Sequence, residues 1–261
     1  MEYLQHIQVY FPLFLLIFAR VSAFLITMPI ISYRTIPNTH KIGLAFFLAV
    51  SMTTNMDAIP LNIDMVYLLL VMKEVVIGLV IGLFAYMIIS GIQIAGGLID
   101  FQMGFAMANV LDPQTGAQVP LMGQYLNYFT WLMLLTVDAH HLLFDGIYYS
   151  TEFMPITQFT SAFGEEGFIL LVVKSFSAMF VIAFQMALPI VGSVLLVDIA
   201  IGILGRTVPQ LNLFVVGYPV KIFVSFVLLI VTMSTFFIAV EKLFELMILS
   251  MRAMMKVIGG A

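Results

Sequence analysis

The sequence has no cysteine among its 261 residues, and only 9% of them are charged. The missing cysteines exclude disulfide bonds, thiolate metal sites and cysteine nucleophiles, and they leave the cellular compartment open. A soluble domain has about 25% charged residues, so this chain lacks the polar surface that such a domain presents to water. Its formal net charge of −4 also provides no basic field for nucleic acid.

Apolar residues are present in large excess, at 62% of the chain, with 24 Phe and 19 Met. This composition predicts an integral membrane protein or a subunit of a membrane complex. The first apolar run, residues 10–31, contains Arg20 and has no small-residue cleavage site after it. We therefore expect this run to remain in the mature protein and not to act as a cleaved signal peptide.

The apolar residues fall into six runs that are too long, and too lacking in alternation, to be strands. The runs cover residues 10–31, 42–56, 65–99, 121–144, 168–204 and 211–240. They predict an all-α fold of hydrophobic helical hairpins, associated with a membrane and without an independent soluble domain. A helix that crosses the bilayer needs about 20 apolar residues, and several runs fit this length poorly. The helices therefore tilt and break, or they pack inside a protein assembly.

We expect one helical domain over residues 1–261, with its N-terminal hairpins in 1–120 and its C-terminal hairpins in 121–261. The first part ends in a glycine-rich loop, and the second contains a polar elbow at residues 205–222. The fifth apolar run is interrupted by Pro189, Gly192 and Asp198. Proline and glycine are weak helix formers, so a break is expected there.

Several charges lie inside apolar runs, where an unpaired charge costs at least about 2.5–3.5 kcal/mol. Arg20, Lys174 and Asp198 are isolated, whereas Lys73 and Glu74 are adjacent. Neighbours on a helix point about 100° apart, so we expect Lys73 and Glu74 to have separate partners. The charges indicate an ion or proton pathway, or ion pairs between subunits. We favour the second interpretation, because no helix face carries a series of carboxylates or histidines.

Two small motifs have alternative interpretations. Gly78 and Gly82 form a small-xxx-small pair, which is typical of a close helix contact within one chain or with another subunit. Asp138, His141 and Asp145 share one helix face, and His140 is expected to point elsewhere. Such a face suits a divalent metal. The three residues lie at the end of an apolar run, however, where polar residues normally meet water. We favour this second interpretation and assign no metal, cofactor or catalytic residue.

The segment 96–120 is apolar and yet rich in glycine, which predicts irregular backbone. At membrane depth such backbone is tolerated only inside protein or along a water-filled cavity. The segment is thus a buried connector or a soft plug that yields to a passing chain. The candidate plug residues are Phe101, Met103, Gly104, Phe105 and Met107, where methionine would supply a deformable apolar contact.

Most of the chain resembles the FliR proteins of the bacterial flagellar type III export gate and their injectisome relatives, the SctT and SpaR proteins. The middle of the chain carries Glu74, Gly78, Gly82, the sequence QIAGGLIDFQMG at 93–104, and Asp112-Pro113-Gln114-Thr115-Gly116. The C-terminal half carries Pro189, Asp198 and the elbow with Arg206, Pro209 and Lys221. The order and spacing of these pieces are specific to that family.

The resemblance implies a non-enzymatic core subunit, without cofactors, in the inner membrane at the flagellar basal body and partly raised toward the periplasm. It implies assembly with FliP- and FliQ-like subunits, contacts with FlhB- and FlhA-like proteins, and passage of unfolded flagellar proteins. It also places a plug at 101–118. Subunit-contact or structural roles fall to Glu74, Gly78, Gly82, Asp112, Pro113, Asp198, Arg206, Pro209 and Lys221. The alternatives are a polytopic transporter of a small solute or ion, and a purely structural scaffold.

Overall fold

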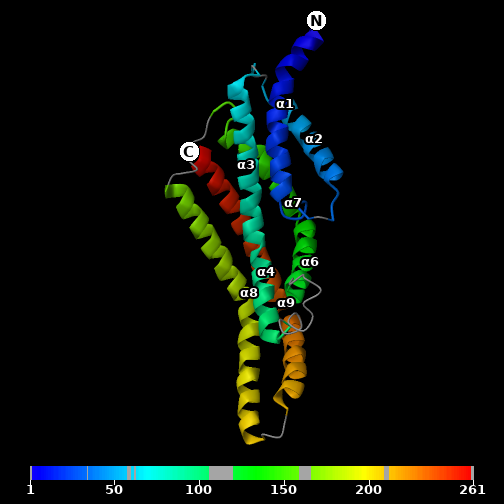
Figure 1. Ribbon diagram of the computed structural model, residues 1–261, viewed down its shortest axis with the longest axis vertical. Coiled ribbons are helices and arrows are strands. Elements are labelled where there is room, and N and C mark those ends of the chain that lie inside the picture. The colour runs from blue at the N-terminus through cyan, green and yellow to red at the C-terminus, as the bar shows by residue number, and fades with distance from the viewer. Residues whose placement is uncertain are drawn as a thin grey trace. The chain divides into compact units, whose positions relative to one another are not determined.

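The computed structural model describes residues 2–33, 35–57, 60–61, 63–105, 120–158, 166–208 and 212–259. All regular elements in these residues are α-helices, which confirms the predicted fold class (Figure 1). The helices are α1 (Glu2–Thr27), α2 (Asn38–Thr54), α3 (Met65–Ile89), α4 (Gly91–Met103), α6 (Leu121–Thr136), α7 (Ala139–Phe153), α8 (Glu166–Thr207) and α9 (Leu213–Gly259).

Local sequence signals account for several helix ends. The Asp64 carboxylate accepts the Tyr67 backbone N–H at 2.9 Å, which satisfies a donor in the first turn of α3. Helix α4 ends at Gly104, whose φ of 88° lies in the left-handed region that glycine adopts without strain. The Phe105 N–H then returns to the Asp100 carbonyl at 3.1 Å, which is the pattern of a Schellman cap.

The chain forms two compact units, and each unit draws on several parts of the sequence. Unit 1 contains residues 1–88, 138–175 and 246–261, and unit 2 contains residues 89–137 and 176–245. The long helices α8 and α9 therefore contribute to both units. The division at residue 120 that the sequence suggests stays a prediction.

In unit 1, α1 packs against α2 and α3. Side chains at helical spacing on α1 are fully buried, as are apolar side chains of α3 and of the end of α9. These residues are Leu13, Leu16, Ile17, Phe24, Ile77, Ile81, Met247 and Met254. In unit 2, α4 packs against α6, and a Cβ at Gly96 would overlap the Gly123 backbone. Glycine at both positions allows the two backbones to approach closely.

Within the part of the chain that the structure describes, four segments are long and apolar enough to cross a membrane: Val9–Thr27, Met65–Met103, Glu166–Thr207 and Val215–Gly259. The 42 residues of α8 extend for about 63 Å at 1.5 Å per residue, twice the roughly 30 Å of a bilayer core. The predicted break in the fifth apolar run is wrong, because Pro189 lies inside continuous α8. The fourth run is instead divided, between α6 and α7.

Two predicted irregular segments are largely helical where the structure describes them. Residues 96–103 belong to α4, so the glycine-rich loop begins later than the sequence indicates. The predicted elbow at 205–222 is also mostly helical. Residues 205–207 end α8, and Lys221 lies inside α9. In both cases the glycine or proline is accommodated because apolar surroundings leave the helix as the way to satisfy backbone hydrogen bonds.

Candidate functional site

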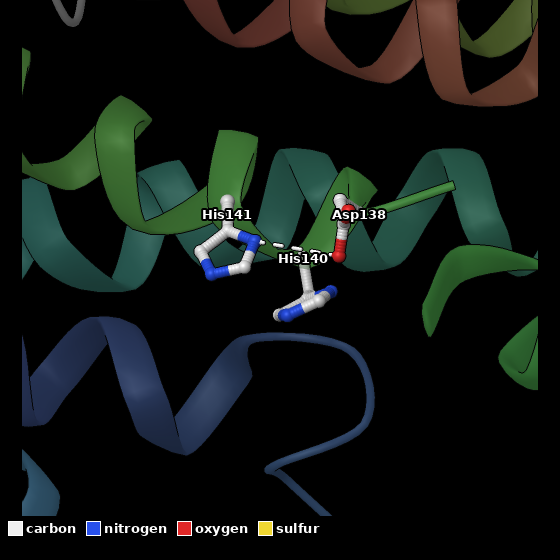
Figure 2. A group of neighbouring side chains, drawn as sticks. All are labelled: Asp138, His140 and His141. Carbon is white, nitrogen blue, oxygen red and sulfur yellow. Dashed lines mark ion pairs between the residues drawn. The ribbon is translucent and has the colours of Figure 1, made fainter. Parts of the chain in front are cut away.

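Asp138, His140 and His141 gather where α7 begins (Figure 2). One ligand atom from each lies within 4.8 Å of the others. This corrects the grouping from the sequence, in which Asp145 took the place of His140. Asp138 precedes α7 and has a positive φ of 55°, so its side chain does not follow the helical phase. Asp145 lines a separate pocket with Arg252 and Lys256.

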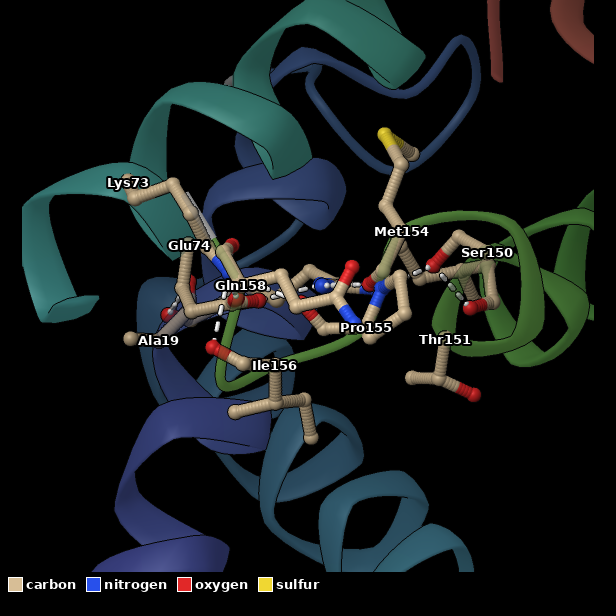
Figure 3. A network of polar contacts seen from close by, with 12 residues as sticks. Ala19, Lys73, Glu74, Ser150, Thr151, Met154, Pro155, Ile156 and Gln158 are labelled. Carbon is tan, nitrogen blue, oxygen red and sulfur yellow. Dashed lines mark hydrogen bonds and ion pairs between the residues drawn. The ribbon is translucent and has the colours of Figure 1, made fainter. Parts of the chain in front are cut away.

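A buried ion-pair network joins three segments of unit 1 (Figure 3). Arg20 on α1 and Glu74 on α3 are fully buried, and Arg20 Nε donates to Glu74 Oε2. The other guanidinium nitrogens donate to Ser150 Oγ at 3.0 Å and to the Met154 carbonyl at 2.9 Å. The planar guanidinium, with its fixed set of donors, thus satisfies groups from three directions.

Lys73 extends this network to the turn after α7. Its Nζ lies 2.8 Å from Glu74 Oε1 and donates to the carbonyls of Pro155, Ile156 and Gln158 at 3.0, 2.7 and 2.9 Å. Lys73 and Glu74 each have partners of their own, as expected. The expectation that they do not also pair with each other is wrong, because the flexible lysine stem turns back over its neighbour. The network fixes the turn after α7 against α1 and α3.

These contacts also revise the preference for ion pairs between subunits. Arg20 pairs with Glu74, and Asp198 pairs with Lys221, so two of the three isolated charges have partners within the chain. Lys174 is exposed on α8. The Gly78 and Gly82 pair also makes an internal contact. A Cβ at Gly78 would collide with the Arg20 carbonyl, and one at Gly82 would collide with the Thr27 hydroxyl.

In unit 2, a second polar cluster joins α4, α8 and α9. Asp198 on α8 forms an ion pair with Lys221 on α9, and Gln102 on α4 donates to Asp198 Oδ2 at 2.9 Å. The side chains of Lys221 and Asp198 are only 21% and 31% exposed, so the pair is partly shielded from solvent. We call Gln102, Asp198 and Lys221 the anchor cluster. It fixes the last turn of α4 directly before the segment 106–119.

Neighbouring contacts restrain the same end of α4. A Cβ at Gly104 would lie 2.5 Å from the Tyr218 ring, so the ring packs directly on the glycine backbone. The buried Asp100 carboxylate accepts the Met122 backbone N–H at 3.0 Å, which satisfies a donor at the start of α6. The contact between Gly104 and Tyr218 was not predictable from local patterns, because 114 positions separate the two residues.

The candidate plug residues differ in their surroundings. Phe101 is 74% exposed, whereas Met103 is fully buried in unit 2. Phe105 is half-buried in the turn after α4. Arg206 is exposed at the end of α8. The positions Met107, Asp112, Pro113 and Pro209 lie outside the described residues.

The apolar helices of membrane-spanning length and the internally paired charges define a membrane-associated, all-α protein. A family model described as bacterial export proteins, family 1, matches residues 11–247. The chain therefore belongs to this family, which confirms the resemblance drawn from the sequence.

Three relatives place the chain more closely. Flagellar biosynthetic protein FliR of Bacillus subtilis (strain 168) is 54% identical over 250 residues, which cover 95% of this chain and 96% of the relative. FliR of Escherichia coli (strain K12) is 27% identical over 87% of this chain and 86% of the relative. Yop proteins translocation protein T of Yersinia pestis is 28% identical over 63% and 62% of the two chains.

Proposed function

We propose that the chain is a core subunit of the flagellar type III export gate in the bacterial inner membrane. The observation that carries this proposal is the 54% identity with a FliR protein over nearly the full length of both chains. The protein performs no covalent chemistry in this role. It helps to form a channel through which unfolded flagellar proteins cross the membrane.

The exposure of the long helices supports a place inside a larger complex. Within the most apolar windows of the α8 and α9 segments only 17% of the residues are buried, against 50% and 56% in the two earlier candidate spans. Lipid covers about 30 Å of such a helix, which leaves much of a 42-residue helix such as α8 to be covered by protein. We assign this surface to FliP- and FliQ-like subunits, with FlhB- and FlhA-like proteins as further partners. The complex would rise partly toward the periplasm.

The segment 101–118 is the proposed plug of this channel, and the anchor cluster holds its start. Met103 packs in the interior of unit 2, and Gly104 provides the turn that directs the chain away from α4. Phe101, Phe105 and Met107 would fill the closed channel with apolar side chains and exclude water and ions. A passing polypeptide displaces these contacts, and methionine adapts to varied substrates. The driving energy comes from the proton-motive force and an associated ATPase.

A deletion of the gene in its host tests the export role. We expect hook and filament proteins to disappear from the culture medium and swimming to stop, and a plasmid copy to restore both. Normal secretion and swimming in the deletion strain would reject the role. In that case transport of a small solute or ion by the reconstituted single chain becomes the next assay.

A deletion within the plug tests gating separately. Removal of residues 104–109 should allow ions to leak across the membrane while the protein still accumulates and assembles. The measurement is the membrane potential of cells that carry the shortened chain. A tight membrane with an assembled complex would show that this segment does not seal the channel.

A further inference from the structure

We propose that Asp138, His140 and His141 bind a divalent transition-metal ion of the Zn²⁺ type. The three residues form this site at the start of α7 (Figure 2). The site shares no residue with the anchor cluster or with the proposed plug, and it does not depend on the export role. Two imidazoles and one carboxylate make a common zinc ligand set, and the remaining position belongs to water.

The distances place the ligand atoms close to coordination geometry. His141 Nδ1 lies 3.7 Å from Asp138 Oδ1, and all three ligand atoms fall within 4.8 Å of one another. In a tetrahedral site with bonds of about 2.0–2.1 Å, ligand atoms lie about 3.4 Å apart. The side chains of His141 and Asp138 are 68% and 76% exposed. Both can therefore rotate to bring their ligand atoms about 1 Å closer together, to the spacing of a tetrahedral site, without disturbing a packed core.

Among the described residues, Asp138 and His140 each lack a hydrogen bond that metal binding would otherwise have to break. Asp138 is the N-cap residue of α7, yet its carboxylate makes no capping hydrogen bond. The buried His140 Nδ1 has no hydrogen-bond partner among the residues that the structure describes. A buried polar atom without a partner is unfavourable, and a coordinate bond to a metal would remove that cost. The neighbouring imidazole rings lie 4.1 Å apart, centroid to centroid.

The ligand atoms of this site, two imidazole nitrogens and one carboxylate oxygen, favour transition-metal ions. Ca²⁺ and Mg²⁺ prefer sites built from oxygen, whereas this site offers two imidazoles and a single carboxylate. Neutral imidazole suits Zn²⁺, Ni²⁺ and Cu²⁺. A bound ion would also hold Asp138 in its left-handed conformation, where φ is 55°. Binding should therefore raise the thermal unfolding midpoint of the chain as well as produce a direct titration signal.

The test is a Zn²⁺ titration of the full-length chain, purified in detergent, freed of its affinity tag and treated with a chelator. A chromophoric chelator reports free Zn²⁺, and we expect one ion to bind per chain. Replacement of an outer-shell partner typically lowers metal affinity 10–100-fold. The loss of a ligand in His141→Ala should therefore lower the affinity at least about tenfold. Asp138→Asn should have a similar effect.

Two matched controls separate this site from nonspecific binding. His40→Ala removes an exposed histidine on α2, and Asp145→Asn removes the carboxylate that the sequence had grouped with Asp138 and His141. Both variants should bind Zn²⁺ as the wild type does, with the same rise in unfolding midpoint. The proposal is overturned if the wild type shows no saturable binding, or if His141→Ala binds as tightly as the wild type. Because His141 is largely exposed, this variant is expected to fold.

Discussion

At the scale of single residues, the buried Arg20–Glu74 pair connects three segments of unit 1. Both side chains are fully buried, and each needs the other to compensate its lost hydration. Their contacts with Ser150 and the Met154 carbonyl mean that the pair also satisfies polar groups of α7 and the turn after it. A substitution at either residue should therefore disturb the packing of α1, α3 and α7 together.

Glu74→Met should destabilise the chain by about 3–5 kcal/mol, because it leaves the Arg20 guanidinium buried without a counter-ion. The double variant Arg20→Met with Glu74→Met removes both charges and should be less damaged than the single variant. Lys73 keeps its carbonyl acceptors in both cases. The measurement is the thermal unfolding midpoint of the detergent-purified chain.

The matched control is Glu241→Gln, which changes an exposed glutamate and should shift stability by no more than about 0.5 kcal/mol. If Glu74→Met unfolds at the wild-type temperature, the pair does not hold unit 1 together. A double variant that unfolds at a lower temperature than Glu74→Met would contradict the idea that the cost comes from an unpaired buried charge.

At the scale of elements, close helix contacts depend on glycine at particular positions. Gly78→Ala should destabilise the chain, because its Cβ would collide with the Arg20 carbonyl and lie 3.0 Å from the Ala23 Cβ. Gly43→Ala, on α2, meets no atom within 4 Å and should stabilise its helix by up to about 1 kcal/mol. Unfolding midpoints of both variants provide the comparison. A Gly78→Ala midpoint equal to or above that of the wild type would show that α1 and α3 do not require the close approach.

The anchor cluster joins three helices next to the proposed plug. Lys221→Gln removes one partner of a partly exposed pair and should cost about 1 kcal/mol, which would increase the population of a detached α4 end about fivefold. If this end holds the plug, the membrane of cells that carry the variant should conduct ions more readily. Lys174→Gln, an exposed lysine on α8, is the control. Equal membrane potentials in both strains would separate the anchor cluster from gating.

The existence of the helices was predictable from the sequence, because long apolar runs leave the backbone no other way to satisfy its hydrogen bonds. The continuity of α8 through Pro189 was not, because an interior proline removes one backbone hydrogen bond and usually kinks or ends a helix. The helical state of Gly96 depends on its contact with Gly123 on α6, which no local pattern reveals. Glycine content alone therefore predicted the wrong conformation there.

The arrangement of the candidate site residues was also only partly predictable from the sequence. The sequence identified Arg20 and Glu74 as charges that need partners, but 54 positions separate them, so local spacing gave no pairing. Asp138 and His141 were correctly placed near each other. In the observed cluster His140 takes the place expected for Asp145. The reason is that α7 begins at Ala139, so Asp138 lies outside its helical phase. Helical periodicity predicts which residues share a face only when all of those residues belong to one helix.

At the scale of the whole molecule, long apolar helices with little burial indicate a chain that is completed by other subunits. A gene deletion shows whether export needs the chain. Only contact with a passing substrate shows that the chain forms part of the path. The residues proposed to line the channel are therefore the ones to test.

The most direct measurement places a photo-crosslinking amino acid at position 101 or 105 in cells that hold a stalled flagellar export substrate. Phe101 is 74% exposed, and position 47 is the control, because Phe47 is 72% exposed but lies on α2 in unit 1. We predict crosslinks to the substrate from 101 and 105 and none from 47. A substrate that is trapped in the assembled apparatus, and yet never crosslinks at 101 or 105, would contradict the account.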